Sequence, residues 1–154
     1  MDVEKIVRDY LQTAKTRMMQ LATSSNNQPW VCTLYYALDE DLSFIWLSLP
    51  ERRHSQEIVK NPNVAGAIAH DQQPPVDFVR GLQFEGKAKL LEDKEEEKAA
   101  KLYIQQLGRE KTLLQDIRSS KNPHKVYKVK VQKFVLVDSQ NFPKDSRQEW
   151  IPNI

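Results

Sequence analysis

The sequence lacks the features that mark several classes of protein. Its 154 residues include one cysteine, Cys32, so no disulfide forms within the chain, which predicts a reducing compartment. Basic and acidic residues nearly balance at 23 against 21, and a net charge of +2 gives none of the basic excess typical of nucleic-acid-binding proteins. No apolar run approaches the roughly 20 residues that cross a bilayer, and no charged segment followed by an apolar one opens the chain. We therefore expect a soluble, cytoplasmic protein that binds neither nucleic acid nor membranes.

The usual catalytic motifs are absent as well. The three histidines, His54, His70 and His124, lack the i, i+4 spacing and the cysteine partners of a zinc site. There is no Gly-x-Ser-x-Gly elbow for a nucleophile and no Walker-type phosphate loop. Carboxylates are plentiful, but none stands in an apolar stretch that would shift its pKa. An enzyme built on this chain is expected to take its chemistry from a cofactor.

What the chain does have is a series of short strand and helix patterns. Strand patterns cover residues 18–23, 30–38, 42–49, 63–69, 82–90 and 125–138. Helical patterns cover most of 1–17 and residues 55–60, 93–107 and 112–117, and residues 72–75 are expected to form a loop. Five or six strands without regular β-α-β alternation predict a mainly β (α+β) fold, a small antiparallel barrel with helical covers. We expect one domain over 1–154, with an N-terminal helix in 1–17 and a polar C-terminal tail over 139–154.

The stretch 28–62 organises the rest of the chain. Residues 30–38 are dense in aromatic and β-branched side chains and predict a strand buried on both faces. Asp39, Glu40 and Asp41 supply a turn, and residues 42–49 return. The pair is therefore expected to form a hairpin at the centre of the sheet.

A candidate anion site follows this hairpin. Ser48 ends the second strand, and Arg52, Arg53 and His54 come just before the helical pattern at 55–60. A helix start offers unpaired N–H groups and a favourable dipole, and an arginine can hold a phosphate through two nitrogens. The pattern fits a phosphate cradle, and it also fits a solvated loop of charged residues.

Local signals make three further predictions. Gly81 and Gly86 fall in the long strand pattern, where each favours a bulge. Asp93 and Glu96 have the spacing of a capping box for the helix over 93–107, which ends before a glycine. Trp150 lies in the polar tail and is expected to dock on an apolar surface.

Three segments resemble the FMN-binding split-barrel superfamily typified by pyridoxamine 5'-phosphate oxidase. They are Gln28-Pro29-Trp30, SLPERRHSQEIVKNP over 48–62 and RGLQFEGKAKL over 80–90, and the likeness extends over residues 18–91. The RGLQFEG pattern is similar to a bacterial branch of the same superfamily. The resemblance implies a split barrel that forms a homodimer and binds FMN at the subunit interface.

The resemblance also implies which residues hold the FMN phosphate. Ser48 and Arg53 match the family by position, and Arg52 stands beside them. His54 occupies the place where the family usually has a lysine.

A second set of residues is implied around the flavin ring. The main chain of Cys32, Thr33 and Leu34 would line the ring, and Gln83 would supply a polar side chain. Trp150 would either cover the ring or plug the end of the barrel.

The chain departs from the oxidase at several positions. Cys32 and Ala37 stand where the oxidase has an arginine and a lysine, and Gly81 stands where it has a glutamine, which Gln83 on the same face would replace. The family's C-terminal arginine and histidine, which hold pyridoxamine phosphate, have no counterpart, since no histidine follows His124. We therefore expect a flavin-dependent oxidoreductase acting on an unknown small molecule, and no true pyridoxamine phosphate oxidase.

Two alternatives stay open. A haem or a deazaflavin would occupy the same cleft, with His54, His70 or His124 as the axial ligand of a haem iron. A non-catalytic ligand-binding or regulatory barrel is the other alternative, and the absent arginine and lysine favour it.

Overall fold

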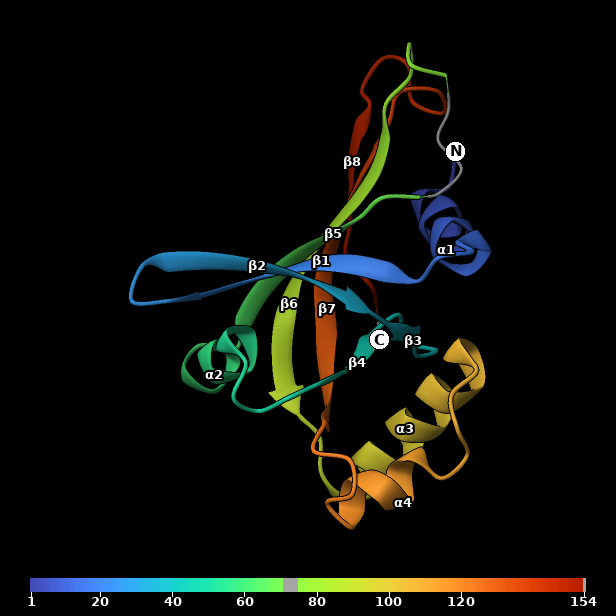
Figure 1. Ribbon diagram of the computed structural model, residues 1–154. Coiled ribbons are helices and arrows are strands. Elements are labelled where there is room, and N and C mark those ends of the chain that lie inside the picture. Colours follow the sequence, from blue (N-terminus) through green and yellow to red (C-terminus); the bar gives the residue numbers. More distant parts are fainter. Residues whose placement is uncertain (71–74, 154) are drawn as a thin grey trace.

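The computed structural model describes residues 1–70 and 75–153 of the chain. In chain order its elements are α1 (Val3–Thr13), β1 (Met18–Ser25), β2 (Gln28–Tyr35), β3 (Ala37–Leu38), β4 (Phe44–Ser48), α2 (Arg53–Lys60), β5 (Asn63–Ile68), β6 (Arg80–Leu90), α3 (Asp93–Leu107), α4 (Leu113–Arg118), β7 (Lys125–Asp138) and β8 (Arg147–Trp150). The described residues thus form eight strands, where five or six were predicted, and four helices (Figure 1). The loop predicted at 72–75 lies outside the described residues, apart from Pro75.

All eight strands belong to one antiparallel sheet. Its order is β2-β1-β5-β6-β7-β4-β3, and β8 adds to β7. β6 and β7 are the two longest strands, and in Figure 1 the β1–β2 hairpin crosses in front of them. α2 lies at one side of the sheet, and α3 and α4 lie together at another. The predicted class, an antiparallel split barrel with helical covers, is confirmed.

The predicted central hairpin is wrong in its pairing. β2 pairs with β1 through a tight turn at Asn26 and Asn27, whose φ angles of 52° and 58° suit a two-residue hairpin loop. The strand is interrupted at Tyr36, and of the predicted 30–38 run only the short β3 pairs with β4. β2 is consequently an outer strand of the order, and it exposes 58% of Val31 and of Tyr35. An apolar run predicted burial on both faces, but apolar side chains on the outer face of β2 are open.

The turn at residues 39–41 was predicted and is confirmed. The N–H of Leu42 donates to the Asp39 carbonyl at 2.9 Å, and the Asp39 N–H donates to the Ser43 carbonyl at 2.9 Å. Leu42 has a φ of 61°, which closes the turn. The chain then enters β4, whose residues are almost all buried.

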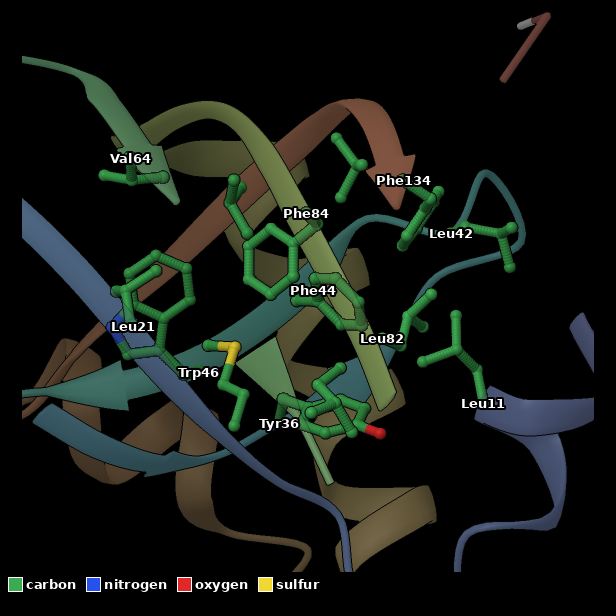
Figure 2. Close-up of a cluster of buried hydrophobic side chains, with 14 of the residues drawn as sticks. Leu11, Leu21, Tyr36, Leu42, Phe44, Trp46, Val64, Leu82, Phe84 and Phe134 are labelled. Carbon is green, nitrogen blue, oxygen red and sulfur yellow. The ribbon is translucent and has the colours of Figure 1, made fainter. Parts of the chain in front are cut away.

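The core lies inside the curled sheet. Figure 2 shows the rings of Tyr36, Phe44 and Phe84 gathered together, with Trp46 beside them. The Phe44 ring lies 5.0 Å from Tyr36 and 4.7 Å from Phe84, centroid to centroid. Burial of each such ring stabilises the fold by roughly 1.5–3 kcal/mol, so β4 and β6 are anchored to each other from the inside.

A second apolar cluster covers part of the outer face. Ile45 of β4 and Ala37 of β3 are fully buried there beneath α3 and α4. The cluster consists of Ala37, Ile45, Leu91, Ala99, Ala100, Tyr103, Leu113, Ile117 and Val126. The β3–β4 end of the sheet is therefore covered on both sides.

The predicted capping box of α3 is wrong, and its predicted end is right. The N-cap is Glu92, no side chain caps it, and Asp93 has a φ of 51°. The Glu96 carboxylate instead pairs with Arg118 of α4 at 3.1 Å, because the two helices pack together. Gly108 ends the helix in the left-handed region with a φ of 63°, as its position indicated.

The bulge prediction holds at one of the two glycines. The β6/β7 register shifts between Glu85 and Gly86, and a Cβ atom on Gly86 would collide with the carbonyl oxygen of Lys130. Gly81 lies in regular pairing, and a Cβ atom there would meet nothing. Glycine is therefore required at 86 for close backbone approach.

The tail contains a strand that the sequence pattern did not predict. β8 pairs with β7, and Trp150 stands opposite Phe134. The two rings stack at 5.7 Å with 14° between their planes. None of the described helices is both long and apolar enough to span a membrane.

Candidate functional site

The residues predicted to form an anion site lie where β4 leads into α2. Ser48 is the last residue of β4, and the connection turns tightly as the Arg52 N–H donates to the Leu49 carbonyl at 3.1 Å. Arg52 is the N-cap of α2, and no side chain caps the helix. The first N–H groups of α2 and the positive end of its dipole therefore remain available to an anion. We call Ser48, Arg52, Arg53 and His54 the α2 cradle.

Ser48 and His54 are joined in the centre of the cradle. The Ser48 Oγ atom lies 2.6 Å from His54 Nε2, and both residues are buried. Burial, and after it the positive charge of Arg52, lower the pKa of His54 below its ordinary value of 6.5, although Glu57 acts in the opposite direction. The imidazole is consequently neutral near pH 7, so His54 hydrogen-bonds in this cradle without adding charge.

Arg53 is held by two neighbours. Its Nε atom lies 3.3 Å from the Glu57 carboxylate one turn further along α2, and its guanidinium lies 4.5 Å from the centre of the Trp30 ring on β2. The buried Glu57 also accepts a hydrogen bond of 3.1 Å from the Thr23 hydroxyl on β1. Arg53 is thus fixed against the β1–β2 hairpin, and its side chain remains 47% exposed.

The residues present suit a phosphate group. Arg52 and Arg53 provide positive charge, Ser48 provides a hydroxyl, and the uncapped start of α2 provides main-chain donors. Each side-chain contact now made inside the cradle is between two protein groups. A bound anion would meet the unpaired main-chain N–H groups of α2 and take over some of these side-chain contacts.

The residues predicted around a flavin ring divide between the two faces of the sheet. Paired residues of antiparallel strands point to the same side, and the rows Thr33–Gln20, Gln20–Ala67 and Ala67–Gln83 place Thr33 and Gln83 together on the outer face. Three strand spacings, about 14 Å, separate these two residues.

Cys32 and Leu34 point to the opposite side and pack against the core. Burial raises the pKa of the Cys32 thiol to about 11, so it is no nucleophile near neutral pH. β2 is hydrogen-bonded on one side only within the described residues, so main-chain groups on its free edge are available to a ligand.

Trp150 lies away from Gln83. It stands in the row of Phe134, on the core side of the sheet, whereas Gln83 stands in the row of Val135 on the outer side. The Trp150 ring stacks on Phe134, and the Arg8 guanidinium lies 5.8 Å from its centre. This packing accounts for Trp150 without a cofactor.

Two residues that contact the cradle escaped the sequence analysis. Glu57 follows Arg53 by four positions in a helix, a spacing typical of ion pairs, and this signal could have found it. Trp30 comes from a different strand, and no local pattern indicated its contact with Arg53.

The histidines give no metal centre in the described part of the chain. No group of three or more possible metal ligands occurs there. The ring of His54 contacts Ser48, that of His70 lies 3.1 Å from the Thr13 hydroxyl, and that of His124 lies 2.8 Å from the Asn122 side chain. Each ring thus already has a protein partner.

The fold is an antiparallel split barrel with a cationic helix start beside its outer strand. A model of the family described as pyridoxamine 5'-phosphate oxidase matches residues 4–138, and the chain belongs to this family. The predicted resemblance is confirmed.

Curated relatives match part of the chain. A UPF0306 protein from Yersinia pestis is 29% identical over 87 residues, which are 56% of this chain and 58% of that protein. The match therefore spans less than two thirds of the relative's length.

Two solved structures with the same fold belong to proteins that bind different cofactors. A haem-binding protein from Mycobacterium smegmatis has a TM-score of 0.67 at 15% identity and covers 93% of this chain and 55% of that one. An FAD-binding protein from Mesorhizobium loti has a TM-score of 0.60 at 18% identity and covers 87% and 90%. At these identities the likeness establishes the fold alone.

Proposed function

We propose that the chain binds FMN with its phosphate in the α2 cradle and acts as a flavin-dependent oxidoreductase on a small molecule. One observation carries the proposal: the joined pair Ser48 and His54, together with Arg53, lies at an uncapped helix start in a chain of the pyridoxamine 5'-phosphate oxidase family. When bound, the flavin ring would supply redox chemistry that the side chains lack.

Each cradle residue has a defined part in this proposal. Arg52 and Arg53 neutralise the phosphate, and Arg53 exchanges part of its contact with Glu57 for the ligand. Ser48 turns its hydroxyl from His54 to a phosphate oxygen, and the neutral imidazole donates from its single N–H. The main chain of residues 32–34 and the Gln83 side chain approach the ring.

The outer face of the sheet supports a homodimer. Val31 and Tyr35 of β2 expose 58% of their surface there, beside small residues of β1 and β5 such as Ala22 and Ala65. An apolar face on an outer strand suits a two-fold contact between identical chains. Thr33 lies on the same face, so the proposed ring site would lie at the contact between subunits.

The departures from the oxidase have a structural counterpart. Ala37, where the oxidase has a lysine, is fully buried beneath α3, and Cys32, where it has an arginine, points to the core. Neither position offers a cation to a ligand. The substrate is accordingly proposed to differ from pyridoxamine phosphate.

An absorption spectrum of the purified protein, followed by titration with FMN, riboflavin and haem, tests the proposal. We expect flavin bands, and tighter binding of FMN than of riboflavin because only FMN carries the phosphate. A Soret band with no flavin affinity would replace the proposal by the haem alternative. Binding of neither flavin nor haem would favour the alternative of a non-catalytic ligand-binding or regulatory barrel. Sedimentation should give twice the mass of one chain.

A further inference from the structure

A second cationic site lies on the outer face of the sheet, where β6 ends and β7 begins. A cavity of about 570 Å³ opens there between these strands, the 39–41 turn and the first half of α3. Its walls include five lysines, which we call the lysine cleft: Lys87, Lys89, Lys98, Lys128 and Lys130. The volume is within the range of small-molecule sites, roughly 300–1,000 Å³.

The strand register places these lysines against each other. Lys87 stands directly opposite Lys130, and Lys89 stands directly opposite Lys128. Like charges in directly opposed positions destabilise an antiparallel pair. Two successive outward rows of the ladder therefore place like charges directly opposite each other.

The other end of the same ladder follows the opposite rule. Arg80 is paired with Asp138 at 3.4 Å, and Glu85 approaches Lys133 at 3.4 Å, each across the two strands. The chain thus matches charges on one half of β6/β7 and opposes them on the other half. If this surface served only to face solvent, matched charges in both halves would make the strand pair more stable.

Acidic neighbours neutralise three of the five lysines. Lys89 pairs with Glu95 at 2.8 Å, and Lys128 and Lys98 approach the Asp39 carboxylate at 2.8 Å and 3.5 Å. Asp39 is buried, and although burial alone would raise its pKa, hydrogen bonds from Lys128 and the Glu40 N–H hold that pKa below its ordinary value. This carboxylate is therefore charged and fixes two lysines in place.

Lys87 and Lys130 are left over. Neither forms an ion pair with a carboxylate in residues 1–70 and 75–153. Both point into the cleft, whose floor includes the apolar Ala88, Leu91 and Ala99. Two unneutralised ammonium groups over an apolar floor suit a ligand with a doubly charged anionic end and a less polar body.

We propose that the lysine cleft binds a phosphate-bearing small molecule. Lys87 and Lys130 contact its phosphate, and Asp39 positions Lys98 and Lys128. This site is separate from the α2 cradle. Ser48 shares the core-facing side of β4 with Phe44 and Trp46, whereas the lysines point outward on β6 and β7. Figure 1 shows α2 and α3 at different sides of the sheet.

Calorimetric titration with pyrophosphate at low salt tests this proposal. Wild-type protein should bind one pyrophosphate per chain, and Lys87→Gln with Lys130→Gln should weaken binding by at least about tenfold, because two charge-assisted contacts are lost. The control is Lys101→Gln with Lys111→Gln, which removes the same charge outside the cleft and should leave binding unchanged.

Three results would overturn the proposal. Equal losses in both double variants would show that net charge alone attracts pyrophosphate. A loss in Arg53→Ala without a loss in Lys87→Gln/Lys130→Gln would place the anion in the α2 cradle. A change of sedimenting mass in Lys87→Gln/Lys130→Gln would show that the lysines contact a second copy of the chain. A circular dichroism spectrum equal to wild type excludes misfolding of each variant.

Discussion

The α2 cradle and the lysine cleft are both cationic, but the protein satisfies their charges to different degrees. In the cradle, Arg53 is held by Glu57 and by the Trp30 ring, and His54 is joined to Ser48. In the cleft, Lys87 and Lys130 oppose each other, and neither forms an ion pair with a carboxylate of the described residues.

This difference has opposite consequences for ligand binding. An anion in the cradle must displace contacts that the protein makes with itself, which costs affinity and favours ligands that replace them well. An anion in the cleft relieves repulsion that is present without it. The cradle is therefore expected to be selective, and the cleft permissive.

The largest effect is expected from removing the Arg53 side chain from the cradle. Arg53→Ala should weaken FMN binding by roughly 2–3 kcal/mol, because a charged hydrogen bond to the phosphate is lost, and it should barely change riboflavin binding. Fluorescence titration with both ligands measures this. Arg8→Ala is the matched control, since Arg8 also pairs with a glutamate one turn away, Glu4, and also lies over a tryptophan. Equal losses for both flavins would mean that Arg53 acts through folding.

A smaller effect of opposite sign is expected at Glu57. Glu57→Gln removes the carboxylate that competes with the phosphate for Arg53 but keeps an oxygen for the Thr23 hydroxyl. FMN should bind more tightly by up to about 1 kcal/mol, the upper range for a solvent-screened pair. The same titration measures it, and weaker FMN binding would show that Glu57 orients Arg53 for the ligand.

The third expectation concerns pH and the cradle histidine. Because the pKa of His54 is lower in the folded chain than its ordinary 6.5, the unfolded chain takes up a proton at a higher pH. The free energy of unfolding should therefore fall as the pH drops below about 6.5. Urea unfolding of wild type and His54→Gln across this range measures it. The variant should show a flatter dependence on pH than wild type, and an equal dependence would contradict this expectation.

The smallest effect tests the cleft without any ligand. Lys87→Gln should raise the free energy of unfolding by about 0.2–1 kcal/mol, because it removes one of two directly opposed charges. Lys133→Gln, on the charge-matched half of the ladder, should lower it by a similar amount. Two variants that both destabilise would remove the claim that the lysines repel.

Sequence patterns were sufficient where the signal is local. The 125–138 pattern matches β7 because its alternation is regular. The end of α3 at Gly108 was predicted because glycine adopts the left-handed conformation that ends a helix. Ser48 and residues 52–54 could be grouped from the sequence because they are neighbours in the chain.

Sequence patterns failed where the outcome depends on pairing. The 30–38 run was assigned to the centre of the sheet because its side chains, among them Val31 and Tyr35, are apolar. In the structure these two side chains are exposed, and β2 is an outer strand. β8 carries mostly polar residues and forms because β7 offers it an edge. Lys87 and Lys130 lie on different strands, and only the register after the Gly86 bulge brings them together.

The most direct test of two separate anion sites is a fluorescence titration with FMN in saturating pyrophosphate. The account predicts that FMN binds with unchanged affinity, because the phosphate occupies the α2 cradle and pyrophosphate occupies the lysine cleft. Displacement of FMN by pyrophosphate in a one-to-one ratio, reproduced in Lys87→Gln/Lys130→Gln, would contradict it.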